Sequence, residues 1–128
     1  MLHRMNDRVD KFVASGARVL LLLEPPQVHV GQTGVTSSDV AYERMNALLK
    51  EVAAKHGGRV AVVNLEARVC PSGPPCPFVV DGFGSTGTPT QQDLNAIRPD
   101  GVHYLPSGAL WVARWLVPQV AAADKKLS

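Results

Sequence analysis

The sequence has no apolar stretch long enough to cross a membrane. Its longest apolar runs, of which Val19 to Leu23 is one, fall far short of the roughly 20 residues that a bilayer-spanning helix needs. The first residues include Arg4 and Arg8 but no apolar segment of the kind found in signal peptides. We therefore expect no membrane span and no signal peptide in this chain. An extracytoplasmic role would require delivery by a segment that precedes Met1.

Basic residues are too scattered for a nucleic-acid interface. The formal net charge is only +2, aromatic residues make up 5% of the chain, and the single short basic cluster is Lys125-Lys126. Nucleic-acid surfaces need a basic stripe with interleaved aromatic side chains, so we expect no nucleic-acid partner. Apolar residues make up 45% of the chain, a share typical of globular proteins, which argues against disorder of the whole chain.

Cysteine is scarce, and both cysteines lie in one short loop rich in proline and glycine. Such a loop can bring the Cα atoms of Cys70 and Cys76 to bonding distance, so we predict a disulfide and an oxidising compartment. The alternative is two free thiols in a cytosolic loop. A zinc site needs about four ligands, and His3, His29 and His56 have no partners at metal spacing. We expect surface histidines, no metal and no organic cofactor.

The apolar periodicity alternates between helical and extended patterns. A period near 3.6 predicts helices, whereas uninterrupted apolar runs predict strands buried on both faces of a parallel sheet. Strand, helix and strand in this order predict an α/β fold, because parallel strands are joined by helical crossovers. The expected helices cover residues 3–14, 39–56 and 106–120, with a cap at Ser38 or Asp39, and the expected strands cover 17–23 and 59–65.

The number of strands is low for such a fold. Two strands are clear, and Phe78 to Val80 is a possible third. Parallel sheets covered on both faces usually contain more strands. We therefore hypothesise that residues 1–128 form one domain that is incomplete by itself. The residues after Ala121 are expected to be frayed, and Trp111 and Trp115 are expected to be core or interface residues.

The segment Arg98-Pro99-Asp100-Gly101-Val102-His103 is the strongest candidate for chemistry. Its spacing lets the carboxylate of Asp100 fold back to Nδ1–H of His103 and leave Nε2 free as a general base. In a parallel α/β sheet this loop should lie beyond the carboxyl ends of the strands, where ligands bind. The alternative is a surface loop whose histidine caps the following helix.

A glycine pattern, Gly82-Phe83-Gly84-Ser85-Thr86-Gly87, matches the spacing of dinucleotide-binding loops. Those loops lie between a strand and a helix, with an acidic residue about 20 residues further on. Here Pro89 and Arg98-Pro99 leave room for only a very short helix, and no acidic residue ends a further strand at that distance. We interpret the pattern as a loop near the proposed active site.

The C-terminal segment resembles the last conserved block of SGNH (GDSL-like) hydrolases. It is closest to the SGNH domains at the extracytoplasmic end of membrane acyltransferases, which add or remove acyl groups on cell-envelope sugars. The cysteine loop and the strand leading into Glu24-Pro25-Pro26 also resemble that group. The residues that carry most of the likeness are Arg98 to Tyr104, Gly108-Ala109 and Trp115 to Pro118.

The resemblance implies a three-layer α/β/α domain with a parallel sheet, of SGNH or flavodoxin-like type. It also implies that Asp100 orients His103 and that His103 activates a serine. The family's Gly-Asp-Ser block and its glycine–asparagine oxyanion block are missing here. Ser37, Ser38 and Ser85 are the remaining nucleophile candidates, and each would have to reach Nε2 of the histidine.

Two hypotheses follow. The first is an ester hydrolase or O-acyltransferase domain acting on acylated carbohydrates or simple esters, located in the cell envelope and attached in the full-length protein to a membrane acyltransferase domain. The second is a truncated or degenerate SGNH module that binds a ligand or partner without turnover.

Overall fold

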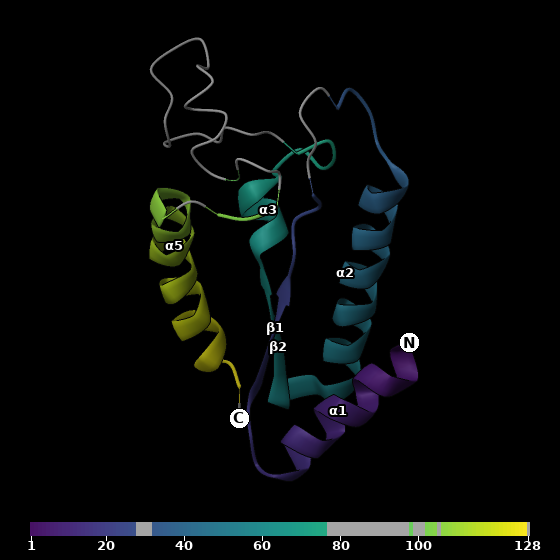
Figure 1. The fold of residues 1–128 in the computed structure, drawn as a ribbon. Helices are drawn as coiled ribbons and strands as arrows, with labels where there is room; N and C mark the ends of the chain where they lie inside the picture. Colours follow the sequence, from purple (N-terminus) through teal and green to yellow (C-terminus); the bar gives the residue numbers. More distant parts are fainter. Residues whose placement is uncertain (28–31, 77–97, 99–101, 105, 128) are drawn as a thin grey trace.

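A computed structural model of the chain describes residues 1–27, 32–76, 98, 102–104 and 106–127. Figure 1 shows the path of the chain. The order of elements is α1 (Leu2–Ala14), β1 (Val19–Leu23), α2 (Ser37–His56), the 3-10 turn η1 (Gly57–Arg59), β2 (Val60–Asn64), α3 (Leu65–Val69) and α5 (Pro106–Asp124).

The two strands are parallel neighbours. Their register pairs Val19 with Val60 and continues without a bulge to Leu23 and Asn64. In Figure 1 the strands run between α2 on one side and α5 on the other. A mixed α/β fold with parallel strands is thus confirmed, and the described residues form a sheet of two strands.

Each face of β1 packs against a different set of helices, because successive side chains of a strand point to opposite faces. One face meets α1 and α2 in a cluster built on Val9, Val52, Val60, Val19 and Leu21. The other face meets α3 and α5, where Leu22 and both tryptophans pack against Leu65, Val69 and Val112. The expectation that Trp111 and Trp115 are packing residues is confirmed.

A reciprocal pair of hydrogen bonds fixes the start of α2. The Thr36 hydroxyl accepts from the backbone N–H of Asp39 at 3.3 Å, and the Asp39 carboxylate accepts from the backbone N–H of Thr36 at 2.6 Å. The predicted caps, Ser38 and Asp39, were therefore wrong. A capping box needs its acidic residue three positions after the cap, so Asp39 selects Thr36.

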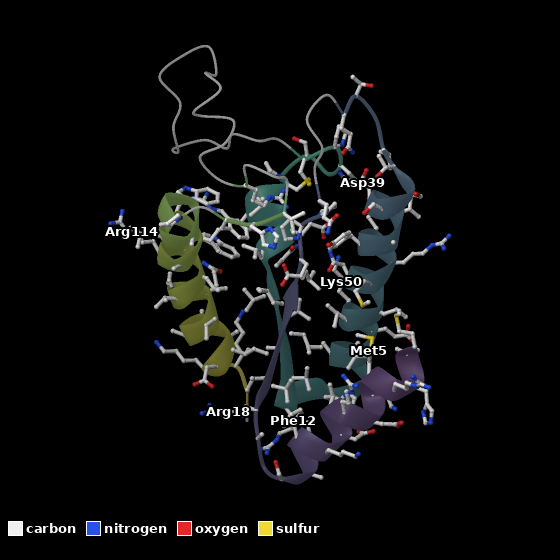
Figure 2. The ribbon with its side chains drawn as sticks, in the orientation of Figure 1. Met5, Phe12, Arg18, Asp39, Lys50 and Arg114 are labelled. Atoms are coloured by element: carbon white, nitrogen blue, oxygen red, sulfur yellow. A yellow bond between two sulfur atoms is a disulfide. The ribbon has the colours of Figure 1, made fainter. Side chains whose placement is uncertain are left out.

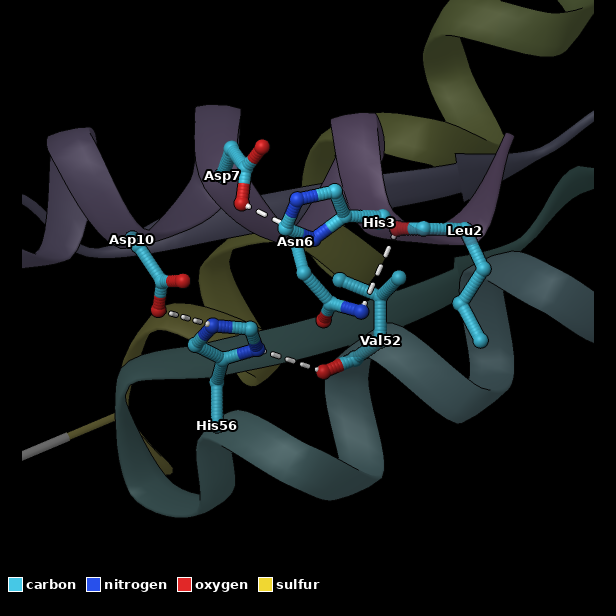
Figure 3. A network of polar contacts seen from close by, with 7 residues as sticks. All are labelled: Leu2, His3, Asn6, Asp7, Asp10, Val52 and His56. Atoms are coloured by element: carbon cyan, nitrogen blue, oxygen red, sulfur yellow. Dashed lines mark hydrogen bonds and ion pairs between the residues drawn. The ribbon is translucent and has the colours of Figure 1, made fainter.

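Helices α1 and α2 are joined by His56, as Figure 3 shows. Its Nδ1 lies 2.7 Å from the Val52 carbonyl, and its Nε2 lies 2.8 Å from Oδ1 of Asp10. The side chain of His56 is only 7% exposed, so its assignment as a surface residue was wrong. His3 is exposed and pairs with Asp7 one turn further along α1, as predicted for a surface residue.

The C-terminal end of α5 departs from the prediction. The helix continues through Pro118 to Asp124, where the sequence had predicted fraying from Ala121. Two contacts explain the difference. Arg18 forms an ion pair with the Asp124 carboxylate at 3.0 Å, and both Ala123 and Leu127 are buried. Tertiary packing therefore stabilises a segment whose local sequence carries no stop signal.

Two further predictions are corrected by burial and by hydrogen bonding. The helical period of residues 3–14 puts Phe12 on the same apolar face as Val9, but Phe12 is 60% exposed whereas Val9 is buried. Leu65 was assigned to the second strand but begins α3, because the Asn64 side chain accepts from the backbone N–H of Ala67 at 3.0 Å and caps that helix.

The first strand is less buried than its sequence predicts. Val19 to Leu22 are only partly buried, and Leu23 alone is fully buried. Among the described residues β1 pairs only with β2, which leaves one edge of the leucine strand without a neighbouring strand.

Candidate functional site

The candidate site lies at the carboxyl end of β1. The Arg98 guanidinium donates a hydrogen bond from Nη1 to the Pro26 carbonyl at 2.8 Å, and Arg98 is only 5% exposed. This bond ties the segment that carries the Asp-x-x-His pattern to the end of the strand, although 72 residues separate the two groups. Arg98 and the end of β1 therefore lie at the edge of a parallel sheet where ligands bind.

Asn46 holds the end of β1 in place from α2. Its side-chain amide donates to the Glu24 carbonyl at 2.8 Å, and its Oδ1 accepts from the Glu24 backbone N–H at 3.1 Å. The same amide donates to the Glu66 carboxylate at 3.0 Å, which adds α3 to the contact. Asn46 is 2% exposed, so these bonds satisfy a polar group that would be costly to bury alone.

A small pocket of about 180 Å³ opens beside these contacts. Ligand pockets for drug-sized molecules are typically about 300–1,000 Å³. The pocket therefore suits a small group. Its walls combine a carboxylate, two phenol rings and a guanidinium with apolar groups, and the described lining residues are Glu24, Pro25, Gln27, Tyr42, Arg98, Val102 and Tyr104.

Two groups in this pocket have shifted protonation equilibria. Partial burial of the carboxyl group raises the pKa of Glu24, and the positive charge of Arg98 acts against that rise. Burial also raises the pKa of Tyr104, where Arg98 opposes the shift and the Glu24 carboxylate adds to it. Tyr104 is therefore a neutral phenol at physiological pH. Its hydroxyl is buried and has no hydrogen-bond partner among the described residues.

The predicted catalytic pair is described only in part. His103 is exposed and lies between Val102 and Tyr104, two residues that line the pocket. Asp100 lies outside the described residues, so the contact between its carboxylate and His103 stays a prediction. Ser85, His29, the glycine pattern at 82–87 and the possible strand at 78–80 also lie outside the described residues.

The other two candidate nucleophiles belong to α2. Ser37 and Ser38 occupy its first turn, just after the Thr36 cap. Ser37 lines a separate apolar pocket together with Met1 and Val40. Neither serine belongs to the described lining of the pocket beside Arg98.

The predicted disulfide is confirmed. Cys70 and Cys76 are bonded, their Cα atoms are 4.7 Å apart, and both residues are buried. The bond closes the loop that follows α3. Within the described ranges, no group of three or more histidine, cysteine or acidic side chains is arranged to hold a metal ion. No helix in the described part of the chain is both long and apolar enough to cross a membrane.

Sequence reasoning singled out the segments that contain Glu24, Arg98 and Tyr104, but it did not predict that these residues share a pocket with Tyr42. The sequence could have pointed to Glu24, because a charged residue directly after a buried strand marks the carboxyl edge of a sheet. It pointed less clearly to Asn46, which adjoins the apolar stripe of α2 that includes Met45 and Leu49. Tyr42 and Arg98 carry no local pattern that would place them in one pocket.

Comparison of the chain with protein-family models, curated proteins and solved structures finds no match in any of the three. The case for a function therefore rests on the geometry and on the sequence motif.

Proposed function

We propose that the chain is an SGNH-type domain for ester hydrolysis or O-acyl transfer, with His103 as general base and Asp100 as the carboxylate that orients it. The observation that carries the proposal is the hydrogen bond from Arg98 to the Pro26 carbonyl. It joins the first residue of the motif segment to the carboxyl end of β1, where an α/β enzyme needs its base.

The polar groups near His103 support this chemistry. Acyl transfer needs a base beside the nucleophile and donors aimed at the oxygen that becomes negative. The Tyr104 side chain and the Arg98 guanidinium line the pocket whose wall includes both chain neighbours of His103, and the buried Tyr104 hydroxyl would have to be uncovered to donate to a substrate. A carboxylate at Glu24 and the rings of Tyr42 and Tyr104 suit a hydroxyl-rich, carbohydrate-like substrate.

The proposal includes the wider setting of the domain. The two parallel strands between α2 and α5 would form part of a three-layer α/β/α domain with further strands. The substrate class is an acylated carbohydrate or a simple ester. The disulfide is a feature of oxidising compartments, and it supports a location in the cell envelope.

Labelling with a fluorophosphonate tests the catalytic role directly. The folded chain would be incubated with the probe and its intact mass measured, because this reagent bonds to serines activated by a base. If Ser85 or another serine of this chain is the nucleophile, we expect one adduct per chain, and we expect His103→Ala to abolish it. His3→Ala removes another exposed histidine and should leave labelling unchanged.

The second candidate function is binding without turnover, which the missing Gly-Asp-Ser block favours. An unlabelled chain with a native circular dichroism spectrum would overturn catalysis by this chain. Binding would then be tested with an O-acetylated methyl glycoside as the probe, followed through the amide signals of Val102 and Tyr104. Shifts of these signals without turnover would support the binding module.

A further inference from the structure

Glu24 is the one acidic residue in the described lining of the pocket beside Arg98. Partial burial of its carboxyl group opposes ionisation, and the positive charge of the Arg98 guanidinium favours it. The same carboxylate acts on the phenol of Tyr104. The Glu24 carboxylate therefore lies close to both the guanidinium and the phenol that share the pocket with it.

The backbone of Glu24 is held in a fixed position. The Asn46 side chain bonds both its N–H and its carbonyl, and the amide of Asn46 also donates to the Glu66 carboxylate. A carbonyl and a carboxylate can only accept, so these bonds determine which end of the Asn46 amide is the donor. A side chain that selects a ligand needs such support from its neighbours, because it must present its polar atoms at a constant place.

The charges in the pocket favour a neutral ligand. An ammonium group would be attracted by Glu24 but repelled by Arg98, and a carboxylate would meet the reverse. A zwitterion would need its carboxylate to reach a guanidinium that is only 5% exposed and already donates to the Pro26 carbonyl. The other described lining residues are of types that are uncharged at neutral pH, namely Pro25, Gln27, Tyr42, Val102 and Tyr104.

The chemistry of a carboxylate narrows the neutral ligand further. An ionised carboxylate has two acceptor oxygens and no donor, so its partner must supply donors, and two adjacent hydroxyl groups match the two oxygens. The rings of Tyr42 and Tyr104 offer apolar surface for the C–H groups that accompany such hydroxyls. The cavity of about 180 Å³ has the volume of about six water molecules in the liquid. It therefore suits one edge of a sugar ring and not a chain of sugars.

We propose that the pocket beside Arg98 binds a neutral vicinal diol and that Glu24 is its specificity-determining residue, accepting hydrogen bonds from both hydroxyl groups while Arg98 balances its charge. The choice of a sugar as the natural diol rests on the proposed function. The contacts that carry the proposal involve neither His103 nor Asp100, so binding alone tests it.

NMR titration of the full chain tests the class of ligand first. The probes are methyl β-D-glucopyranoside, cyclohexanol with its single hydroxyl group, methylammonium and acetate, and the signals followed are the amides of Val102 and Tyr104. We expect saturable shifts with the glycoside and much weaker binding of the other three. The titration uses the unmodified chain, so it does not depend on a variant that folds.

Glu24→Gln tests the residue. It keeps the length of the side chain but removes its charge, so glycoside binding should weaken roughly tenfold, because charged acceptors form the stronger hydrogen bonds. The charge of Arg98 is then unbalanced, so acetate should bind more tightly than it does to the original chain. Glu51→Gln makes the same change at an exposed glutamate of α2 outside the described lining, and it should leave both affinities unchanged.

An original chain that fails to bind the glycoside, or that binds methylammonium or acetate more tightly, would overturn the proposal. So would a folded Glu24→Gln variant with unchanged glycoside affinity, or one that binds acetate no better than the original chain. These results are separate from the test of catalysis. A chain that binds the glycoside through Glu24 but takes up no fluorophosphonate would contradict only the proposed catalytic role of His103.

Discussion

At the scale of single residues, His56 is the clearest pH-sensitive contact. Its hydrogen bond to the Val52 carbonyl raises the pKa of His56 above 6.5, and the bond to Asp10 adds to that rise. Both partner atoms are acceptors, so only a protonated imidazole can donate to both. The protonated form therefore holds α1 and α2 together best.

The sign of the pH dependence follows from this shift. Because the folded-state pKa is raised, the stabilisation is fully present below about pH 6.5 and is lost as the pH rises through the folded pKa. We expect His56→Gln to lower the free energy of unfolding by about 1 kcal/mol at pH 6 and by less at pH 8.5. Urea unfolding at both pH values measures the difference. An equal loss at both values would contradict the role of the protonated ring.

At Tyr104 we expect a substitution to affect substrate binding and not the stability of the fold. Its buried hydroxyl has no hydrogen-bond partner in the part of the chain that the structure describes, so Tyr104→Phe should leave the free energy of unfolding unchanged or raise it by about 1 kcal/mol. If the phenol serves the substrate, the same variant should raise KM for an ester probe. Tyr42→Phe, which removes the other phenol hydroxyl of the pocket lining, is the variant for comparison. Clear destabilisation by Tyr104→Phe would mean that the hydroxyl is structural.

At the scale of elements, the start of α2 depends on the Thr36–Asp39 capping box. Asp39 is fully buried, and its carboxylate also accepts from Gln32 at 2.8 Å and from the Thr36 hydroxyl at 2.8 Å. Thr36→Ala should therefore lower the free energy of unfolding by about 1–2 kcal/mol. Ser37→Ala changes the exposed neighbour and should cost less than about 0.5 kcal/mol. Thermal unfolding of both variants separates the cap from general surface effects.

The elements themselves were largely predictable from local patterns. Both strands and the three long helices follow from apolar periodicity, because this signal depends only on residues a few positions apart. The cap at Thr36 and the short helix α3 were missed, because each depends on a side chain bonding a specific backbone group. Partial exposure of β1 was also missed, since it depends on which strands are neighbours.

At the scale of the whole molecule, two arginines join distant parts of the chain. Arg18 binds the last turn of α5, and Arg98 binds the end of β1. Figure 2 shows Arg18 and Asp39 at opposite ends of the molecule, so the α5 contact lies far from the start of α2. The sequence predicted the loop's position at the strand ends from the rule for parallel sheets. It gave no sign that Arg98 binds the Pro26 carbonyl, because the bond spans 72 residues.

Arg98 should therefore be a structural requirement for the site. Arg98→Met keeps most of the apolar stem but removes a buried hydrogen bond to the Pro26 carbonyl, so we expect a loss of about 2 kcal/mol in the free energy of unfolding. The NMR signals of His103 should shift in the same variant, because the segment loses its tie to β1.

The control for this prediction is Arg114→Met. Arg114 is an exposed arginine on α5 whose side chain points away from the strands in Figure 2. Its replacement should change the free energy of unfolding by less than about 0.5 kcal/mol and leave the His103 signals in place. If Arg98→Met behaved like this control, the hydrogen bond to Pro26 would not position the motif segment. The proposed site at the end of β1 would then lack the hydrogen bond that connects the motif segment with the strand.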